Sequence, residues 1–350
     1  MKKLILMLSV SSMIVLLAAC QFGNPSGGES ITVFSERHYE SDYALYESFT
    51  DQTGIRVNIV RDGADPLLSR LENEGEDTIA DVLVIADAGG LERAKERGLL
   101  RPIDSEFLIE TVPENLRDPE NHWFGMTMRA RVFVYHPDRV DSSELSTYEA
   151  LTEPAWHGRV ITRSSENIYN QTLMASFIEI LGEEAARDFA EGLVHNFAVR
   201  PDGTSTPRGN DRAQAISVLA GEADLAIMNT YYIGVMLNSG DSTQIEAART
   251  LSVFFPNQDT TGTHVNASAV GVVKHSSNVE AATQFVEFLL SEEAQRHFTT
   301  TNFEYPVNPN VEWADLLKGW GTFNAQDVHL SVLGKYNRRA KEIMDEAGWR

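Results

Sequence analysis

An alternation of short apolar runs with amphipathic stretches constrains the fold of this chain more than any other feature. The first series spans 31–99, where expected strands at 31–34, 55–60 and 82–85 alternate with expected helices at 43–49, 66–71 and 91–96. Gly54 and Gly98 stand where helices are expected to end. This pattern predicts an α/β fold with a parallel sheet and right-handed crossovers.

A second α/β series follows without a flexible linker. Its expected strands are 126–135, 160–162, 225–228, 251–255 and 269–273, and its expected helices are 168–181, 183–194, 212–219, 279–290, 292–298 and one near 330–347. The polar segment 200–211 contains two prolines and two glycines, which predicts a loop. We therefore expect two lobes, joined by strands that cross between them, around a central cleft. The expected lobe boundaries are 31–127 with 254–300 for the first lobe and 128–253 with 301–350 for the second.

The amino terminus has the features of an export signal. Lys2 and Lys3 precede an apolar run at 4–19, which is shorter than the ~20 residues that a membrane span needs. The run ends in Leu-Ala-Ala-Cys, which resembles the lipobox of bacterial lipoproteins, so Cys20 is expected to carry the lipid. A plain cleaved signal with an incidental cysteine is the alternative. We expect 1–19 to be removed and 20–30 to form a tether.

Composition excludes several classes of site and partner. Cys20 is the only cysteine among 350 residues, so neither a disulfide framework nor a thiolate metal site is expected. The formal charge is −22, and loss of Lys2 and Lys3 makes it −24, which argues against nucleic acid or anionic lipid headgroups as partners. The membrane is then contacted through the lipid alone.

Tyrosines follow three of the expected strands. His38 and Tyr39 come after the first strand, Tyr169 after the strand at 160–162, and the pair Tyr231 and Tyr232 after the strand at 225–228. In α/β proteins ligands collect beyond the carboxyl ends of strands, so these segments are expected to face the cleft. One alternative is ordinary packing, in which adjacent aromatics near a strand end are one core residue and one partly exposed residue.

Together these segments resemble bacterial ferric-iron-binding proteins of ABC importers, in the branch that holds iron with one histidine and four tyrosines. The resemblance extends from residue 31 to the last helix and includes the segments 80–83 and 86–89. Its most specific parts are the tyrosine pair and the Asn-Ile-Tyr-Asn-Gln segment at 167–171. It implies a type II periplasmic-binding-protein-like fold, a monomer that is no enzyme, and an importer permease as partner. The protein would be an anchored lipoprotein facing the periplasm or the cell exterior.

The resemblance also implies an iron-ligand set. His38 and Tyr39 would come from the first lobe, and Tyr169, Tyr231 and Tyr232 from the second. Fe(III) is a hard cation that prefers anionic oxygen, and at bonding distance it holds a phenolate deprotonated although free tyrosine has a pKa of about 10. Other branches use a glutamate, two tyrosines and an anion, but no segment here clearly offers that glutamate. The sixth ligand, water or a synergistic anion such as carbonate, stays open.

Arginines near these segments suit an anion or a charged metal centre. The candidates are Arg37, Arg129, Arg131 and Arg208. Four phenolates and Fe(III) carry a formal charge of −1, which a guanidinium would offset. Structural ion pairs are the alternative role for Arg129 and Arg131. Asp81 and Asp87 are expected to cap helices or to support ligands.

Other functions have weaker support in the sequence. The chain shows no P-loop, no dinucleotide-binding glycine motif, no nucleophile elbow and no zinc-protease motif, so no catalytic pair is expected. The remaining histidines show no ligand spacing and are expected to be surface or hydrogen-bonded polar residues. The alternatives are a same-fold binder of a polyamine, phosphonate or thiamine, or a structural adhesion lipoprotein without ligand.

Overall fold

The computed structural model describes residues 29–37, 39–199, 203 and 209–350. The expected signal peptide at 1–19, the lipidation site Cys20, and the candidates His38 and Arg208 lie outside these ranges. Within the described ranges, no helix has both the length and the apolar composition needed to cross a membrane.

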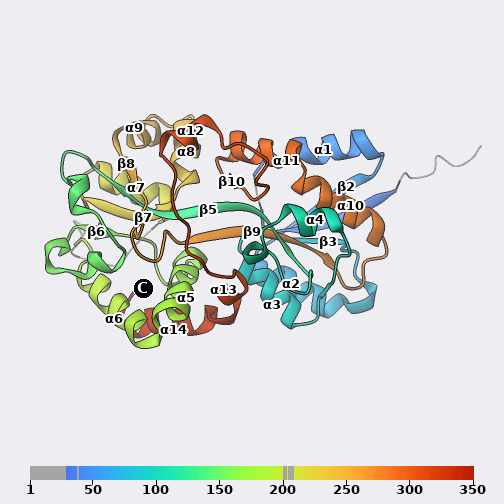
Figure 1. The fold of residues 1–350 in the computed structure, drawn as a ribbon, viewed down its shortest axis with the longest axis horizontal. Helices are drawn as coiled ribbons and strands as arrows, with labels where there is room; N and C mark the ends of the chain where they lie inside the picture. The colour runs from blue at the N-terminus through green and yellow to red at the C-terminus, as the bar shows by residue number, and fades with distance from the viewer. Residues whose placement is uncertain (1–28, 38, 200–202, 204–208) are drawn as a thin grey trace, which may run out of the picture.

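The strands form one mixed sheet that runs through the molecule (Figure 1). They are β1 (Ser30–Ser35), β2 (Arg56–Arg61), β3 (Val82–Ile85), β4 (Leu100–Arg101), β5 (Phe124–Tyr135), β6 (Val160–Ile161), β7 (Leu225–Asn229), β8 (Ser252–Phe254), β9 (Val265–Val273) and β10 (Tyr305–Pro306). The main order is β2-β1-β3-β9-β5-β7-β6. The pairs β1–β2, β1–β3 and β6–β7 are parallel, as the alternation predicts.

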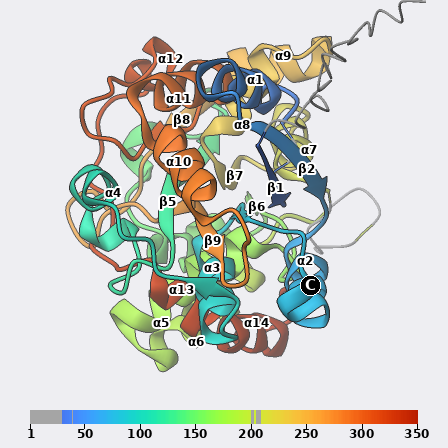
Figure 2. The same ribbon diagram turned by 90° about the vertical axis from the view of Figure 1, so that its right-hand side faces the viewer.

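Helices cover the sheet on both sides. They are α1 (Asp42–Thr53), α2 (Ala64–Glu74), α3 (Ala88–Glu96), α4 (Glu106–Thr111), α5 (Ile168–Leu181), α6 (Glu183–His195), α7 (Asp211–Leu219), α8 (Tyr231–Leu237), α9 (Ser242–Thr250), α10 (Val279–Leu290), α11 (Glu292–His297), α12 (Asp315–Gly319), α13 (Ser331–Lys335) and α14 (Asn337–Glu346). Figure 2 looks along the sheet from the end of the first half, where α1 and α10 lie on one side of the strands and α2 and α3 on the other.

Two long strands, β5 and β9, join the halves of the molecule. β5 pairs with β9 from Phe124 to Ala130, and then continues onto β7 from Arg131 to Tyr135. β9 continues onto β3 at its other end. Figure 1 shows both strands crossing the middle of the molecule. The crossing strands are thus confirmed, but the sheet is mixed and not parallel, because one strand leaves the first half and the other returns to it in the opposite direction.

The carboxyl-terminal segment differs from expectation. One helix was expected near 330–347, but the structure has α13 and α14, separated at Tyr336. α13 lies so close to α3 that a Cβ at Gly334 would stand 2.8 Å from the carbonyl oxygen of Gly89. α14 packs against α5 and α6, and α13 also contacts α5. The segment therefore contacts both halves of the molecule.

The segment after β7 also differs. A loop containing the tyrosine pair was expected, but the chain forms α8 directly after Thr230. The run 231–237 is Tyr-Tyr-Ile-Gly-Val-Met-Leu, which is apolar throughout, so helical periodicity could not reveal it. The short helices α4, α9 and α12 were likewise missed.

His264 sits at the start of the returning strand and is fully buried. Its Nδ1 lies 3.1 Å from Oε1 of Gln326, and its Nε2 lies 3.3 Å from Oγ1 of Thr172. Burial lowers the pKa of His264 to about 3, and the charges of Arg131 and Arg129 act in the same direction. His264 is thus a neutral, hydrogen-bonded residue, as expected for the histidines without ligand spacing.

This buried histidine should make stability depend on pH. Since its folded pKa lies below the unfolded value, stability is complete above about pH 6.5 and is lost as the pH falls toward 3, by up to about 1.4 kcal/mol per unit. We expect a His264→Gln variant to lose less unfolding free energy than the native protein between pH 7 and pH 4. Urea unfolding at several pH values measures this, and equal slopes for the two proteins would contradict it.

Candidate metal centre

Four tyrosines line one cavity of about 420 Å³ between the two halves of the molecule. Tyr39 lies in the loop between β1 and α1, Tyr169 in the first turn of α5, and Tyr231 and Tyr232 open α8. The phenol oxygens of Tyr169 and Tyr231 are 3.4 Å apart. The ring of Tyr231 stacks on Tyr232 at 4.2 Å between centroids, and it meets Tyr39 edge-on at 6.3 Å. The structure thus brings together all four tyrosines singled out from the sequence.

The surroundings of three of the four tyrosines keep their phenols protonated in the absence of a ligand. Burial raises the pKa of Tyr39 and of Tyr231 well above the ordinary value, and also raises the pKa of Tyr232. For Tyr39 the negative charge of Glu304 adds to this effect, while the guanidinium of Arg37 opposes it. A phenolate would therefore form here only beside a strong positive charge, such as that of a bound metal cation.

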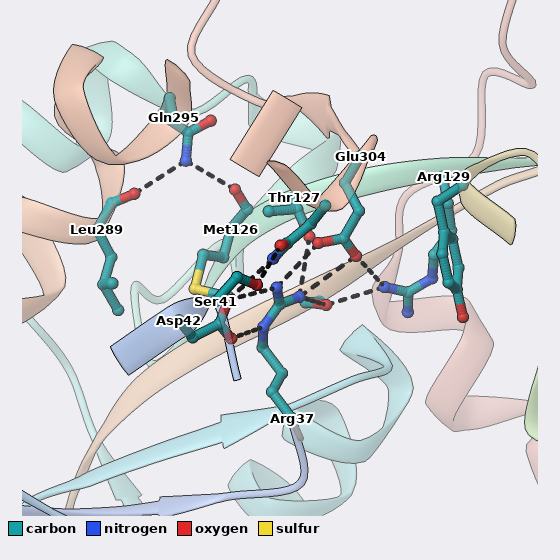
Figure 3. Close-up of polar contacts among 12 residues, drawn as sticks. Arg37, Ser41, Asp42, Met126, Thr127, Arg129, Leu289, Gln295 and Glu304 are labelled. Carbon is teal, nitrogen blue, oxygen red and sulfur yellow. Dashed lines mark hydrogen bonds and ion pairs between the residues drawn. The ribbon is translucent and has the colours of Figure 1, made fainter. Parts of the chain in front are cut away.

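Arg37 lies beneath the cavity in a buried polar network (Figure 3). Its Nε donates to Asp42 at 3.0 Å, and its Nη2 donates to Glu304 at 2.9 Å. Its Nη1 donates to the hydroxyl of Ser268 on β9 at 2.9 Å. The guanidinium carbon stands 4.8 Å from the centre of the Tyr39 ring, which is cation–π distance. Arg37 therefore supports Tyr39 and joins it to the returning strand.

Arg129, on β5, lines the cavity itself. Its Nη1 donates to Ser268 at 2.8 Å and contacts Glu304 at 3.4 Å, so the expected alternative of an ion pair holds for this residue. Its guanidinium carbon is 5.1 Å from the centre of the Tyr169 ring. The Nε and Nη2 atoms are buried without a hydrogen-bond partner among the described residues. These two nitrogens could serve an anion in the cavity.

Arg131 is not among the residues that line the cavity. Its Nη1 donates to Asp211 at 2.8 Å, and its Nη2 donates to Asn170 at 2.5 Å. The other carboxylate oxygen of Asp211 accepts from Arg163 at 3.1 Å, and Arg163 does line the cavity. Arg131 thus acts on the cavity through Asp211, as a partner in a buried ion pair.

Sequence reasoning missed several residues around the cavity. Arg163 and Arg212 line it, and Asp42 and Glu304 support it from below. Glu304 stands in the segment Asn-Phe-Glu-Tyr-Pro, where a carboxylate between aromatic residues is the only hint of burial. Of the two expected supporting aspartates, Asp87 caps α3 by accepting from the amide of Gly90 at 3.2 Å.

The described part of the molecule offers two other candidate binding sites, a second cavity and a group of three metal-ligating side chains. A cavity of about 500 Å³ adjoins the tyrosine cavity and shares Ile168 with it, but the described residues that line it include no tyrosine. Asp118, Glu120 and His122 gather closely enough to hold a cation. Lys95 already occupies that position, with its Nζ 2.6 Å from Asp118 and 2.7 Å from Glu120. The tyrosine cavity is therefore the better candidate.

A model of the family described as bacterial extracellular solute-binding protein matches residues 77–324. The chain belongs to this family.

Relatives of this solute-binding protein include iron-uptake and iron-binding proteins. Iron uptake protein A1 of Synechocystis sp. is 47% identical over 326 residues, which cover 93% of this chain and 89% of the relative. The major ferric iron-binding protein of Neisseria meningitidis is 26% identical over 335 residues, which cover 95% of this chain and 97% of the relative.

Solved structures show the same fold. A Trichodesmium protein solved in complex with iron and citrate ligands superposes with a TM-score of 0.87 at 45% identity, over 92% of this chain and 100% of the other. The ferric binding protein of Campylobacter jejuni gives a TM-score of 0.85 at 39% identity, over 91% and 100% of the two chains. The expected two-lobed fold of type II periplasmic binding proteins is confirmed.

The buried ion pairs of this solute-binding protein differ in strength from those at its surface. Asp211 and Asp224 each bridge two arginines in the second half of the chain, but Asp211 is fully buried while the Asp224 side chain is 22% exposed. We expect Asp211→Asn to cost about 3–5 kcal/mol of unfolding free energy, because it leaves two arginines uncompensated. We expect Asp224→Asn to cost less, because water screens its partners. Chemical denaturation of both variants tests this, and equal losses would contradict it.

Proposed function

We propose that this protein captures ferric iron in the tyrosine cavity and delivers it to an ABC-type importer. The observation that carries the proposal is the convergence of four phenol groups, from three separate segments, on one cavity. Tyr39 comes from the loop between β1 and α1, Tyr169 from α5, and Tyr231 and Tyr232 from α8. The relatives' names as iron-uptake and ferric iron-binding proteins support the same role.

The chemistry of the lining favours Fe(III) over other metals. Among the described residues that line the cavity there is no aspartate or glutamate, whereas Ca²⁺ and Mg²⁺ are bound mainly by carboxylate and carbonyl oxygens. The chain contains a single cysteine, Cys20, so a site with several soft thiolate ligands cannot form. A small, triply charged cation is the metal that gains most from several phenolates.

We assign the ligand set to His38, Tyr39, Tyr169, Tyr231 and Tyr232. The four tyrosines meet in the cavity, and His38, which lies outside the described residues, precedes Tyr39 directly. A water or a synergistic anion such as carbonate would take the sixth position. The Nε and Nη2 atoms of Arg129, which have no partner within the described ranges, favour the anion, since a guanidinium edge offers two parallel donors.

An organic anion is the second candidate. Arg129, Arg163 and Arg212 all line the cavity, which suits a phosphonate. The same arginines, with no lining carboxylate among the described residues, argue against the cations thiamine and polyamine. A phosphonate would leave the tyrosines without a role, so we favour iron.

We propose the remaining context from the sequence. The mature protein would be an exported monomer, tethered by lipid at Cys20, with an importer permease as its partner and no catalytic activity of its own. Its lobes would comprise 31–127 with 254–300 and 128–253 with 301–350. Iron would first bind Tyr169, Tyr231 and Tyr232 in an open form, and closure would then bring His38 and Tyr39.

A ferric titration tests the site directly. We expect metal-stripped mature protein, titrated with ferric citrate, to develop an orange-red phenolate-to-iron band that saturates at about one iron per chain. The double variant Tyr231→Phe, Tyr232→Phe should lose the band, because it removes two of the four phenolates. Visible absorption measures both.

A matched control uses another contacting tyrosine pair. Tyr43 and Tyr46 lie on α1 with ring centroids 6.0 Å apart and are not among the cavity residues. Tyr43→Phe, Tyr46→Phe should keep the full band. A colourless native protein that binds a phosphonate would support the second candidate and contradict the iron proposal.

The order of binding predicts a change in shape. Since the two sides supply different ligands, closure should accompany iron binding, as in other hinged binding proteins. We expect solution X-ray scattering to give a smaller radius of gyration for the iron-loaded protein than for the metal-free protein. A Tyr39→Phe variant should compact less, and identical radii for both forms of the native protein would rule out this sequence of events.

A further inference from the structure

Glu304 is a fully buried carboxylate that holds two arginines at once (Figure 3). Its Oε2 accepts from Nη2 of Arg37 at 2.9 Å, and its Oε1 accepts from Nη1 of Arg37 at 3.3 Å and from Nη1 of Arg129 at 3.4 Å. Asp42 compensates the remaining charge of Arg37. A carboxylate that shares two guanidiniums in a dry environment fixes both in space.

Each of those arginines supports a tyrosine from a different side of the cavity. Arg37 stands 4.8 Å from the centre of the Tyr39 ring, and Arg129 stands 5.1 Å from the centre of the Tyr169 ring. Glu304 therefore connects the tyrosine expected from the first lobe with one expected from the second. None of the other described carboxylates is paired with both arginines.

The backbone that carries Glu304 is irregular. A π-helical turn spans Phe298–Asn302 and ends at Phe303, which adopts a left-handed conformation with φ of 58°. Such a conformation is uncommon for a bulky residue, and π-turns concentrate at functional sites. We call the segment 298–304 the π-corner. It contains the third proposed crossing of the chain between the lobes, at 300/301.

The π-corner also contacts the first-half segment beside Tyr39. The side-chain Nδ2 of Asn302 donates to the Asp42 carboxylate at 2.8 Å, and its Oδ1 accepts from the hydroxyl of Ser41 at 2.6 Å. The guanidinium carbon of Arg37 lies 5.1 Å from the centre of the Phe298 ring. These contacts tie the π-corner to the loop that presents Tyr39.

On its other side, the π-corner touches the helix of the tyrosine pair. Phe303 packs onto Gly234, three residues after Tyr231 on α8, so closely that a Cβ at Gly234 would stand 2.3–2.6 Å from atoms of the Phe303 side chain. Only glycine leaves room for this contact. The π-corner thus reaches the Tyr39 loop, Arg129 beneath Tyr169, and α8.

We propose that Glu304 is a positioning residue, and that the π-corner couples the placement of Tyr39 to that of the tyrosines on the opposite side of the cavity. This inference rests on the proposed iron site. Through the two arginines, Glu304 sets where the Tyr39 and Tyr169 rings lie. Through Phe303, the same segment sets where α8 presents its tyrosine pair.

A double-mutant cycle separates this role from simple structural support. The substitution Glu304→Gln keeps the size and shape of the side chain but removes the negative charge that pairs with both arginines. We expect ferric affinity to fall by at least about tenfold and the phenolate-to-iron band to shift. Because part of the effect of Glu304 passes through Arg37 and Tyr39, the same change in a Tyr39→Phe background should cost at least about threefold less than it costs in the native protein. Additive effects in the two backgrounds, or an unchanged affinity and band, would overturn the proposal.

Asp118→Asn is the matched control. Asp118 is also a buried carboxylate with a cationic partner, Lys95, but it lies away from the cavity. The Asp118→Asn variant should have a lower melting temperature than the native protein, with unchanged ferric affinity and an unchanged phenolate-to-iron band. If the native protein itself shows no band with stoichiometric iron, the proposed function fails together with this inference. A native band with a Glu304→Gln protein that behaves like the native one overturns only the inference.

Gly234→Ala carries the test if Glu304→Gln does not fold. The added methyl group must displace Phe303 or α8, so ferric affinity should fall by at least about fivefold. Gly192→Ala, on α6, is its control, because a Cβ there would stand 2.7 Å from Cβ of Thr152 and neither residue lines the cavity. Equal ferric affinity in Gly234→Ala and Gly192→Ala would contradict the coupling.

Discussion

The cavity depends on a buried network of ion pairs that joins Arg37 and Arg129 to Asp42 and Glu304. A guanidinium or carboxylate buried alone costs several kcal/mol, so each of these groups is tolerable beneath the tyrosines only because the others are present. The network draws on the loop after β1, on α1, on both crossing strands and on the segment before β10. Holding these charges together therefore also holds together the elements that present the phenols.

The chemistry of the cavity follows from this arrangement. Burial raises the pKa values of Tyr39, Tyr231 and Tyr232, so these three phenols stay neutral unless a strong positive charge stands beside them. Arg129 lines the same cavity with two nitrogens that have no hydrogen-bond partner in the described part of the chain, and its charge would offset the negative charge of several phenolates. Such a cavity would favour a cation of high charge density, because a weaker charge would not offset the free-energy cost of deprotonating the phenols, and the described lining residues offer no sulfur to a soft metal.

Much of the fold could be predicted because it is written in local periodicity. The apolar runs at 31–34 and 82–85 and the helical spacing in 168–181 correspond to β1, β3 and α5 with small shifts at the ends. Features set by contact between distant segments could not be predicted. The close packing of α13 on α3, where Gly334 meets Gly89, is one such contact, and α8 is hidden by a uniformly apolar run.

By itself, the sequence determined the α/β class, the strands that cross between the halves, and the tyrosines that end near one another, because strand ends in such sheets face the same cleft. Only the tertiary structure decided which charged side chains lie beside those tyrosines. Arg131 and Arg129 are two residues apart on β5, so their side chains share one face of the strand by simple alternation. Yet one pairs with Asp211 and the other lines the cavity. That difference, like the place of Glu304, arises from partners 80 and 175 residues away in the chain, which no local pattern can encode.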